Sequence, residues 1–313
     1  MAPGSMSGDG RGAGYAVLLV AYGSPRGLDE VESYLNDVRG GRPTTREIVV
    51  ELQRRYAAIG GRSPLLERTE TQAAALGRAL GGPPVYVGMR HWHPYVGDVM
   101  ARMRGDGQQR VVALPLAPHF SGLSIGAYRR AIEAGRGQLE VAMVPEWFDH
   151  PGFLDAVADR VREGLARFEP DRRETVALIF TAHSLPQRIL ADQDPYPTQL
   201  QASVAGVLER VGRTEARLAY QSAGQSPEPW LRPDAADVLR ELASAGARDI
   251  LVCPIGFVSD HLEVLYDVDI ELRGVASGLG IRLERTGSLN DHPTFIASLA
   301  ALVRESARRA GWA

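Results

Sequence analysis

The sequence predicts an α/β protein with two similar domains, each built on a parallel sheet flanked by helices, and a cleft between them. The chain has 313 residues, which is long enough for two α/β halves that each have their own core. Apolar stretches of strand length alternate with helical patterns, as is typical of parallel sheets covered on both faces. The two halves also resemble each other at the points where their strands end. These three observations together indicate a duplicated α/β architecture.

Eight apolar stretches are predicted to be strands. Four lie in the first half, at Tyr15–Tyr22, Val85–Met89, Arg110–Leu116 and Leu139–Val144. Four lie in the second half, at Thr175–Ala182, Arg217–Gln221, Asp249–Phe257 and Ile281–Arg285. Between the first two strands, 45–59 and 69–80 place apolar residues on one stripe, which predicts two helices.

Matching strand ends support a duplication. AYGSP (21–25) parallels AHSLP (182–186), and LPLAPHFS (114–121) parallels CPIGFVSDH (253–261). We place the boundary near Ala134, which gives a first domain of 15–133 plus 287–313 and a second of 134–286. The last helix, Thr294–Arg309, is expected to pack back on the first half. Residues 1–14 are rich in Gly and Ser and lack a secretory signal pattern, so we expect a disordered tail.

The composition argues against several classes of function. Lys and Arg number 35 against 38 Asp and Glu, a net charge of −3 that offers no electrostatic footprint for nucleic acid. The single cysteine, Cys253, lies within an apolar stretch, so we expect it to be buried and expect no iron–sulfur cluster. No apolar run reaches the roughly 18 residues of a membrane span. We therefore expect a soluble, cytoplasmic protein.

Several residues that can do chemistry fall at predicted strand ends, where open α/β sheets bind ligands. His183 ends one such strand, and imidazole can accept a proton or bind a transition metal near neutral pH. The alternative is a histidine whose hydrogen bonds are satisfied by the backbone. The other residues at such ends are Tyr22, His91, His119, His261 and Glu263.

Three carboxylates, Glu263, Asp267 and Glu271, recur at four-residue spacing in a predicted helix. This spacing places them on one face, in a row about 12 Å long. Acidic rows are usually solvated helix faces. Here a buried strand precedes the row and an apolar stretch accompanies it, so we predict that the row, with His183, binds Fe²⁺, Zn²⁺ or Co²⁺ loosely.

Tyr22 precedes a glycine and, two residues later, a proline, which end its strand. It is either a core aromatic or an exposed phenol that can ligate iron. The arginines at 39, 46, 54, 55 and 62 either form a solvated helix face or bind ligand carboxylates through their guanidinium groups. No glycine-rich phosphate loop is present, so nucleotide binding has no support.

From Tyr15 to about Arg304 the chain resembles the ferrochelatase family. The matching segments are AYGSP (21–25), YAAIGGRSPL (56–65), APHFSGLSIGAY (117–128), TAHSLP (181–186), YQSAGQSPEPWLRPD (220–234) and GFVSDHLEVLYD (256–267). The resemblance implies two Rossmann-like domains of the chelatase type with a porphyrin cleft between them. It also implies a lyase of haem biosynthesis that takes Fe²⁺ as its substrate metal.

The same resemblance implies roles for individual residues. His183 and Glu263 would face the porphyrin centre and carry the catalysis. Tyr22 is typical of the Gram-positive type, which makes iron coproporphyrin from coproporphyrin III, and would be the axial ligand. Asp267 and Glu271 would be an outer metal position. The expected contacts to the macrocycle or its propionates are Arg39, Arg55, Tyr56, Ser63 and Tyr128.

Two departures from the family and several alternatives remain. The chain has Arg90 where the family often has lysine, and Gln193 where it often has glycine. The alternative substrates are protoporphyrin IX, and sirohydrochlorin with cobalt or iron. A non-catalytic haem-binding carrier is a further alternative from another class. We expect a monomer without a membrane span, with enzymes of the haem pathway as candidate partners.

Overall fold

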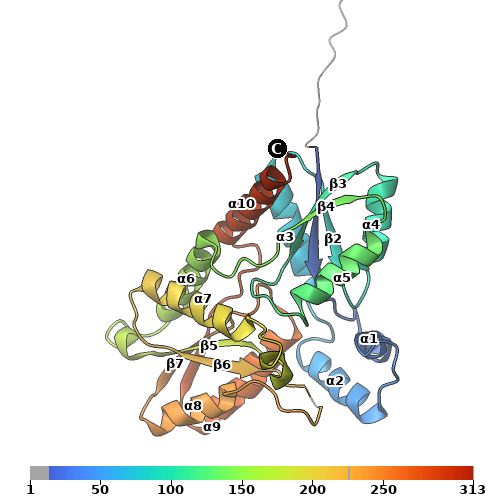
Figure 1. Ribbon diagram of the computed structural model, residues 1–313. Helices are drawn as coiled ribbons and strands as arrows, with labels where there is room; N and C mark the ends of the chain where they lie inside the picture. Colours follow the sequence, from blue (N-terminus) through green and yellow to red (C-terminus); the bar gives the residue numbers. More distant parts are fainter. Residues whose placement is uncertain (1–13, 225, 313) are drawn as a thin grey trace, which may run out of the picture.

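The computed structural model describes residues 14–224 and 226–312, which form two four-stranded parallel sheets (Figure 1). The first sheet has the order β2-β1-β3-β4 and consists of β1 (Ala16–Ala21), β2 (Val85–Met89), β3 (Arg110–Pro115) and β4 (Glu140–Met143). The second has the order β6-β5-β7-β8 and consists of β5 (Ala177–His183), β6 (Arg217–Gln221), β7 (Asp249–Cys253) and β8 (Arg282–Arg285). The identical strand order agrees with the predicted duplication, and all eight predicted strands are present.

One predicted strand is too long. β7 ends at Cys253 rather than at Phe257. The next residue is Pro254, which has no backbone N–H to donate to a neighbouring strand. The segment from 254 to 262 is therefore a loop at the carboxyl end of the sheet. Cys253 itself is buried, as predicted.

The helices cover both faces of each sheet (Figure 1). In the first half these are α1 (Val31–Val38), α2 (Arg46–Ala58), α3 (Leu65–Leu80), α4 (Val96–Gly105) and α5 (Ile125–Gly135). The rest are α6 (Pro151–Leu165), α7 (Tyr196–Val211), α8 (Ala235–Ser244), the π-helix η4 (Glu263–Leu272), α9 (Arg273–Gly278) and α10 (Pro293–Arg309). Short 3₁₀ turns lie at η1 (Leu28–Glu30), η2 (Arg173–Thr175) and η3 (Gln187–Leu190).

The two halves share their largest hydrophobic core, which the sequence did not predict, and each half also has a smaller core of its own. Alternate residues of a strand point to opposite faces of its sheet. Val17 of β1 and Leu178 of β5 belong to one continuous cluster, which also includes residues of α3, α6, α7 and α10. The opposite faces have separate cores, under α4 and α5 in the first half and under α8, η4 and α9 in the second.

The boundary predicted near Ala134 also requires correction. β4 pairs in parallel with β3, with Val112 opposite Ala142, so the first sheet continues to Met143. The last helix, α10, packs against α3, as expected, and against α6. The Arg304 guanidinium donates a hydrogen bond of 2.6 Å to the carbonyl of Ala79 at the end of α3.

Gln193 has an unusual backbone conformation for a residue other than glycine. Its φ of 53° lies in the left-handed region, which favours glycine because a β-carbon is crowded there. The chain therefore has a residue with a β-carbon where the backbone suits glycine, at some cost in strain. Gln193 directly precedes the loop that leads into α7.

Residues 1–13 of the predicted tail lie outside the described residues. Within the described residues, no helix combines the length and apolar character that crossing a membrane requires.

Candidate active site

A cavity of about 840 Å³ lies between the two halves, at the carboxyl ends of their strands. The loops after β1, β2 and β3 supply its wall on the first half, and the end of β5 with the loop after β7 supplies the other. Helices α1 and α2 contribute to its rim. Among the residues that line the cavity are Tyr22, Arg39, Arg42, Tyr56, Ser63, Arg90, Tyr128, His183, Arg188, Tyr196, His261 and Glu263.

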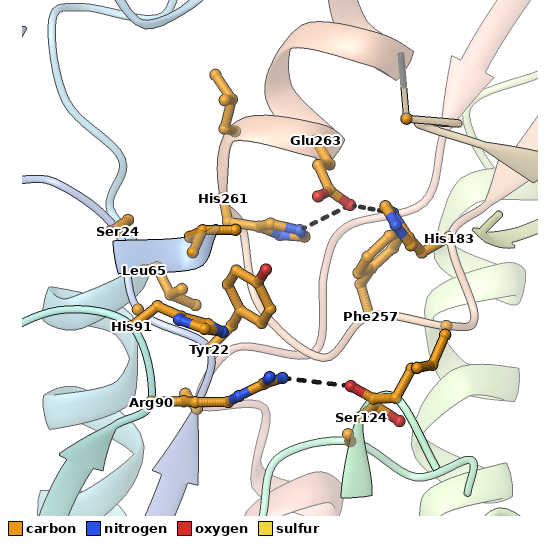
Figure 2. Close-up of a pocket in the computed structure, with 18 of the residues that line it drawn as sticks. Tyr22, Ser24, Leu65, Arg90, His91, Ser124, His183, Phe257, His261 and Glu263 are labelled. Atoms are coloured by element: carbon orange, nitrogen blue, oxygen red, sulfur yellow. Dashed lines mark hydrogen bonds and ion pairs between the residues drawn. The ribbon is translucent and has the colours of Figure 1, made fainter. Parts of the chain in front are cut away.

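His183 and Glu263 meet on one wall of the cavity (Figure 2). His183 is the last residue of β5, and Glu263 is the first residue of the π-helix η4. The Nδ1 atom of His183 lies 2.9 Å from Oε2 of Glu263, and each side chain is 33% exposed. The Gln221 side chain donates a hydrogen bond of 3.0 Å to the carbonyl of Glu263, which fixes the start of the π-helix against β6. This bond anchors the start of the π-helix to β6, the strand that pairs with β5.

Electrostatics favour the ionised form of this pair. Burial alone would lower the pKa of His183, but the negative charge of Glu263 and the hydrogen bond to it leave that pKa raised above its usual value of 6.5. Burial would likewise raise the pKa of Glu263, but the charge and hydrogen bond of His183 hold it well below the usual range. The imidazole is thus a stronger base than a free histidine.

His261, which the sequence placed at a strand end but to which it assigned no role, is a neighbour of this pair. Its Nε2 atom lies 3.9 Å from Oε2 of Glu263, and its Nδ1 atom lies 3.0 Å from the carbonyl of Ser259. The interaction with Glu263 helps to lower the pKa of that carboxyl. The spacing of His261 and Glu263, two residues apart at the start of a helix, is the signal that could have identified it.

Tyr22 comes from the opposite half and follows β1 directly. Figure 2 shows its hydroxyl pointing toward the side of the cavity where His261 and Glu263 lie. The side chain is 41% exposed, yet the surrounding protein and the charge of Glu263 raise the pKa of Tyr22 to about 12. The Arg90 guanidinium lies 5.9 Å from the ring centroid and acts in the opposite direction. The phenol is therefore neutral near pH 7.

Four of the five predicted macrocycle contacts line the cavity: Arg39, Tyr56, Ser63 and Tyr128. Burial raises the pKa of Tyr56 and of Tyr128, so both hydroxyls keep their proton. Ser63 also has a structural task, because its Oγ accepts a hydrogen bond of 3.2 Å from the backbone N–H of Leu65 in the first turn of α3. Arg42 and Arg188, which the sequence did not single out, line the cavity as well.

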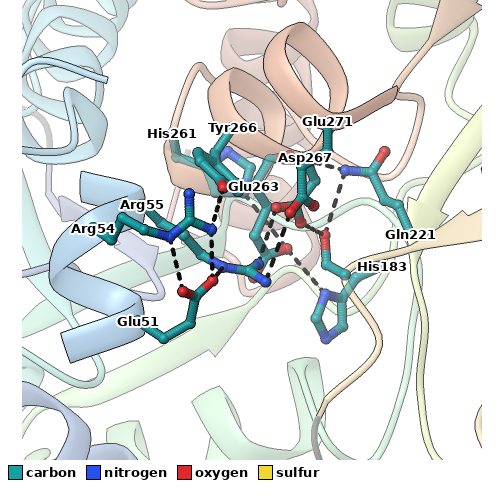
Figure 3. Close-up of polar contacts among 11 residues, drawn as sticks. Glu51, Arg54, Arg55, His183, Gln221, His261, Glu263, Tyr266, Asp267 and Glu271 are labelled. Atoms are coloured by element: carbon teal, nitrogen blue, oxygen red, sulfur yellow. Dashed lines mark hydrogen bonds and ion pairs between the residues drawn. The ribbon is translucent and has the colours of Figure 1, made fainter. Parts of the chain in front are cut away.

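Arg55, the fifth predicted contact, does not reach the cavity wall. Its guanidinium lies among carboxylates of α2 and the π-helix (Figure 3). Its Nε atom is 2.9 Å from Oε1 of Glu51, and its Nη1 atom is 3.4 Å from Oδ1 of Asp267. Its Nη2 atom is 3.9 Å from Oε1 of Glu271. Arg55 therefore neutralises part of the acidic row in this structure.

The acidic row itself differs from the prediction in two respects. Residues 263–272 form a π-helix with i→i+5 hydrogen bonds instead of an α-helix. Asp267 accepts a hydrogen bond from the Ser222 hydroxyl and is only 9% exposed. Burial and the charge of Glu263 raise its pKa to about 6.

Across the described ranges, no three His, Cys, Asp or Glu side chains form a group able to hold a metal ion.

The chain is similar to known proteins over most of its length. A family model described as "Ferrochelatase" matches residues 14–307. A "Ferrochelatase" from Herpetosiphon aurantiacus is 44% identical over 297 residues, which cover 92% of this chain and 97% of the relative. A "Coproporphyrin III ferrochelatase" from Anoxybacillus flavithermus is 41% identical over 305 residues, which cover 94% and 97%.

Solved structures agree on the fold. SirB from Bacillus subtilis with Fe³⁺ has a TM-score of 0.61 at 13% identity, covering 95% of this chain and 97% of that one. At this identity the likeness concerns the fold alone. The family model covers nearly the whole chain, and relatives above 40% identity span most of its length, so the chain belongs to the ferrochelatase family.

Proposed function

We propose that this protein is a ferrochelatase that inserts Fe²⁺ into coproporphyrin III and releases iron coproporphyrin III, a step of haem biosynthesis. The single observation that carries the proposal is the contact of 2.9 Å between His183 and Glu263 on the cavity wall. The family membership supports the same reaction. The name of the Anoxybacillus relative supports the choice of porphyrin.

The reaction replaces two pyrrole N–H protons by one Fe²⁺, so the site must remove two protons for each metal inserted. His183 accepts pyrrole protons, because its imidazole faces the cavity and is a stronger base than a free histidine. Glu263 stabilises the imidazolium that forms and relays the protons away from the porphyrin. Both side chains can also contact the incoming Fe²⁺.

The macrocycle has to bend before metal can enter, because the lone pairs of a planar ring point inward. The enclosing walls of the cavity supply this distortion from the binding energy of the rest of the ring. Tyr22, which lines the cavity from the opposite half, ligates the inserted iron on the other face of the macrocycle in this proposal. Its neutral phenol lies beside the guanidinium of Arg90.

The arginines of the cavity support coproporphyrin III over protoporphyrin IX. Arg39, Arg42, Arg90 and Arg188 all line the cavity, and guanidinium groups match carboxylates in geometry as well as in charge. Coproporphyrin III carries more propionates than protoporphyrin IX. A substrate with more carboxylates therefore uses more of this lining.

An anaerobic insertion assay tests the substrate directly. Coproporphyrin III, protoporphyrin IX and sirohydrochlorin are offered at equal concentration with Fe²⁺, and with Co²⁺ in a parallel series. We expect kcat/KM for coproporphyrin III to exceed the other two by about tenfold or more. Faster metallation of another tetrapyrrole would overturn the choice of substrate. Binding of haem without metallation of any of them would identify a carrier.

A pair of arginine variants tests the role of the cavity lining. Arg39→Gln removes a guanidinium of the cavity, whereas Arg46→Gln removes one from the exposed start of α2 outside it. We expect KM for coproporphyrin III to rise about tenfold in the first variant, since a charged hydrogen bond is lost. The second variant should leave KM within a factor of about two. Equal KM values in both variants would contradict a role for Arg39 in binding.

A further inference from the structure

Tyr196 links His183, the proposed proton acceptor of the cavity, to helix α7. It is the first residue of α7, and its hydroxyl donates a hydrogen bond of 3.0 Å to the backbone carbonyl of His183. The side chain is buried, and burial raises the pKa of Tyr196 so far that the hydroxyl keeps its proton throughout the working range. His183 stands at the end of its strand, where the ladder of β5 stops. The tyrosine therefore holds the peptide unit after His183 from its carbonyl side, and the Ser184 N–H of that unit donates a hydrogen bond of 2.7 Å to the carbonyl of Gln221.

The start of α7 is itself fastened to the other half. Oδ1 of Asp194 accepts a hydrogen bond of 3.1 Å from the backbone N–H of Tyr196. Its Oδ2 accepts bonds of 2.8 Å from the Ser121 hydroxyl and from the N–H of Gly122, both in the loop after β3. One carboxylate thus joins the first half to the residue that holds His183.

Two further contacts fasten the same helix, at Gln199 about one turn on and at Ser203 about two turns on. The Ser203 hydroxyl donates a hydrogen bond to the carbonyl of Phe148, so its oxygen accepts a hydrogen bond of 2.9 Å from the Nε2–H of His119. The N–H of Phe120 donates a bond of 2.6 Å to Oε1 of Gln199. The His119 ring also meets the Tyr196 ring edge to face, with centroids 6.3 Å apart. Successive residues of the loop after β3 are therefore bound along α7.

We propose that Tyr196 is a positioning residue for the insertion reaction, which holds His183 against Glu263 and links that pair, through Asp194, to the wall on the first half. The strain at Gln193, directly before Asp194, fits this role, because strained backbone is retained where the surrounding structure needs a particular shape. The kinetic part of this inference rests on the proposed function. The spectroscopic part does not, because it concerns the protein without porphyrin.

The test compares Tyr196→Phe with Tyr86→Phe. Both variants lose one phenol oxygen, but the Tyr86 hydroxyl binds Asp106 on the outside of the first half, away from the cavity. In Tyr196→Phe we expect kcat for iron insertion to fall about tenfold with KM for the porphyrin unchanged, because a displaced base loses alignment without losing substrate contacts. Tyr86→Phe should keep both values.

The second measurement is the ring N–H signal of His183 in ¹⁵N-histidine-labelled protein without porphyrin, assigned by its loss in His183→Ala. Nδ1 bonded to Glu263 should give a slowly exchanging, downfield proton in the wild type and in Tyr86→Phe. In Tyr196→Phe this signal should shift or broaden. An unchanged signal together with an unchanged kcat would overturn the proposal, and a tenfold rise in KM would make Tyr196 a substrate contact instead.

Asp194→Asn provides an independent variant if Tyr196→Phe folds poorly. It keeps the phenol but weakens the acceptor for Ser121, Gly122 and Tyr196, so a smaller change in the same direction is expected. A wild-type protein that shows the His183 signal but inserts no iron would overturn the proposed function and leave the positioning role standing.

Discussion

The imidazole of His183 and the carboxylate of Glu263 are hydrogen-bonded across two elements, with 2.9 Å between Nδ1 and Oε2. His183 ends a strand and Glu263 begins a π-helix, so 80 residues of chain separate two groups that act together. Each partner shifts the pKa of the other in the direction that favours charge. This coupling gives the enzyme a pH dependence that can be measured.

The acidic limb of the pH profile tests the coupling. His183 is active as a base only when neutral, so kcat/KM should rise with pH as the medium passes the raised pKa of His183. In Glu263→Gln the carboxylate charge is gone while burial remains, so the pKa of His183 should fall and the limb should move to lower pH. Profiles of both proteins provide the check. A limb that stays in place or moves to higher pH would contradict the coupling.

Tyr22→Phe should change the product complex more than the rate of insertion. The phenol faces the cavity from the half opposite His183, where it can ligate iron after insertion. We expect a clear change in the absorption spectrum of bound iron coproporphyrin III, whereas Tyr86→Phe should give the wild-type spectrum. The same spectrum in all three proteins would remove Tyr22 as a ligand.

Asp267→Asn should stabilise the protein at neutral pH. The folded pKa of about 6 is raised above the usual 3.8, so the folded state binds this proton more tightly than the unfolded state. The stability contributed by the protonated Asp267 carboxyl is therefore fully present below about pH 4 and is lost as the pH rises through about 6. The amide carries no charge to bury, and it can still accept the hydrogen bond from Ser222.

The gain in unfolding free energy for Asp267→Asn should be about 2 kcal/mol at pH 8 and smaller at pH 5. Denaturant unfolding at pH 5, 6, 7 and 8 measures it. Glu51→Gln is a matched control, because Glu51 is more exposed and its pKa is lowered to about 2, so the difference in stability should not grow over this range. A gain that shrinks from pH 5 to pH 8 would refute the raised pKa.

Gln193→Gly should relieve the strain before α7. Glycine adopts the left-handed region freely but loses more entropy on folding, so the net gain in unfolding free energy is expected to be about 0.5 kcal/mol. Gln193→Ala keeps the strain and removes the side chain, and it should not gain stability. Thermal unfolding of the three proteins distinguishes the two causes. A glycine variant less stable than the alanine variant would show that the backbone entropy lost by glycine outweighs the strain.

The sequence was sufficient to predict the two sheets and the place of the site. The apolar strands are nearly continuous, and parallel strands deliver their carboxyl ends to one edge, which brings Tyr22 and His183 to the same cavity. The sharing of one core between the halves was not predictable in this way. An apolar face in the sequence predicts that the face is buried, but it does not predict which element buries it.

The π-helix and the position of Arg55 were beyond the sequence for another reason. Val264, Val268 and Leu272 are buried at four-residue spacing, which suits an α-helix and a π-helix alike. Arg55 faces carboxylates that are near in sequence, such as Glu51, and carboxylates more than 200 residues away, such as Asp267. Competition between those partners and a substrate propionate depends on the folded geometry.

The rate of Fe²⁺ insertion into coproporphyrin III by wild type and by His183→Ala tests the central claim most directly. Porphyrin binding, followed by fluorescence quenching, serves as the control for an intact cavity. We predict that His183→Ala binds coproporphyrin III with a dissociation constant close to that of the wild type and inserts iron at least about 100-fold more slowly, since the proton acceptor is lost. Normal turnover in His183→Ala would contradict the account.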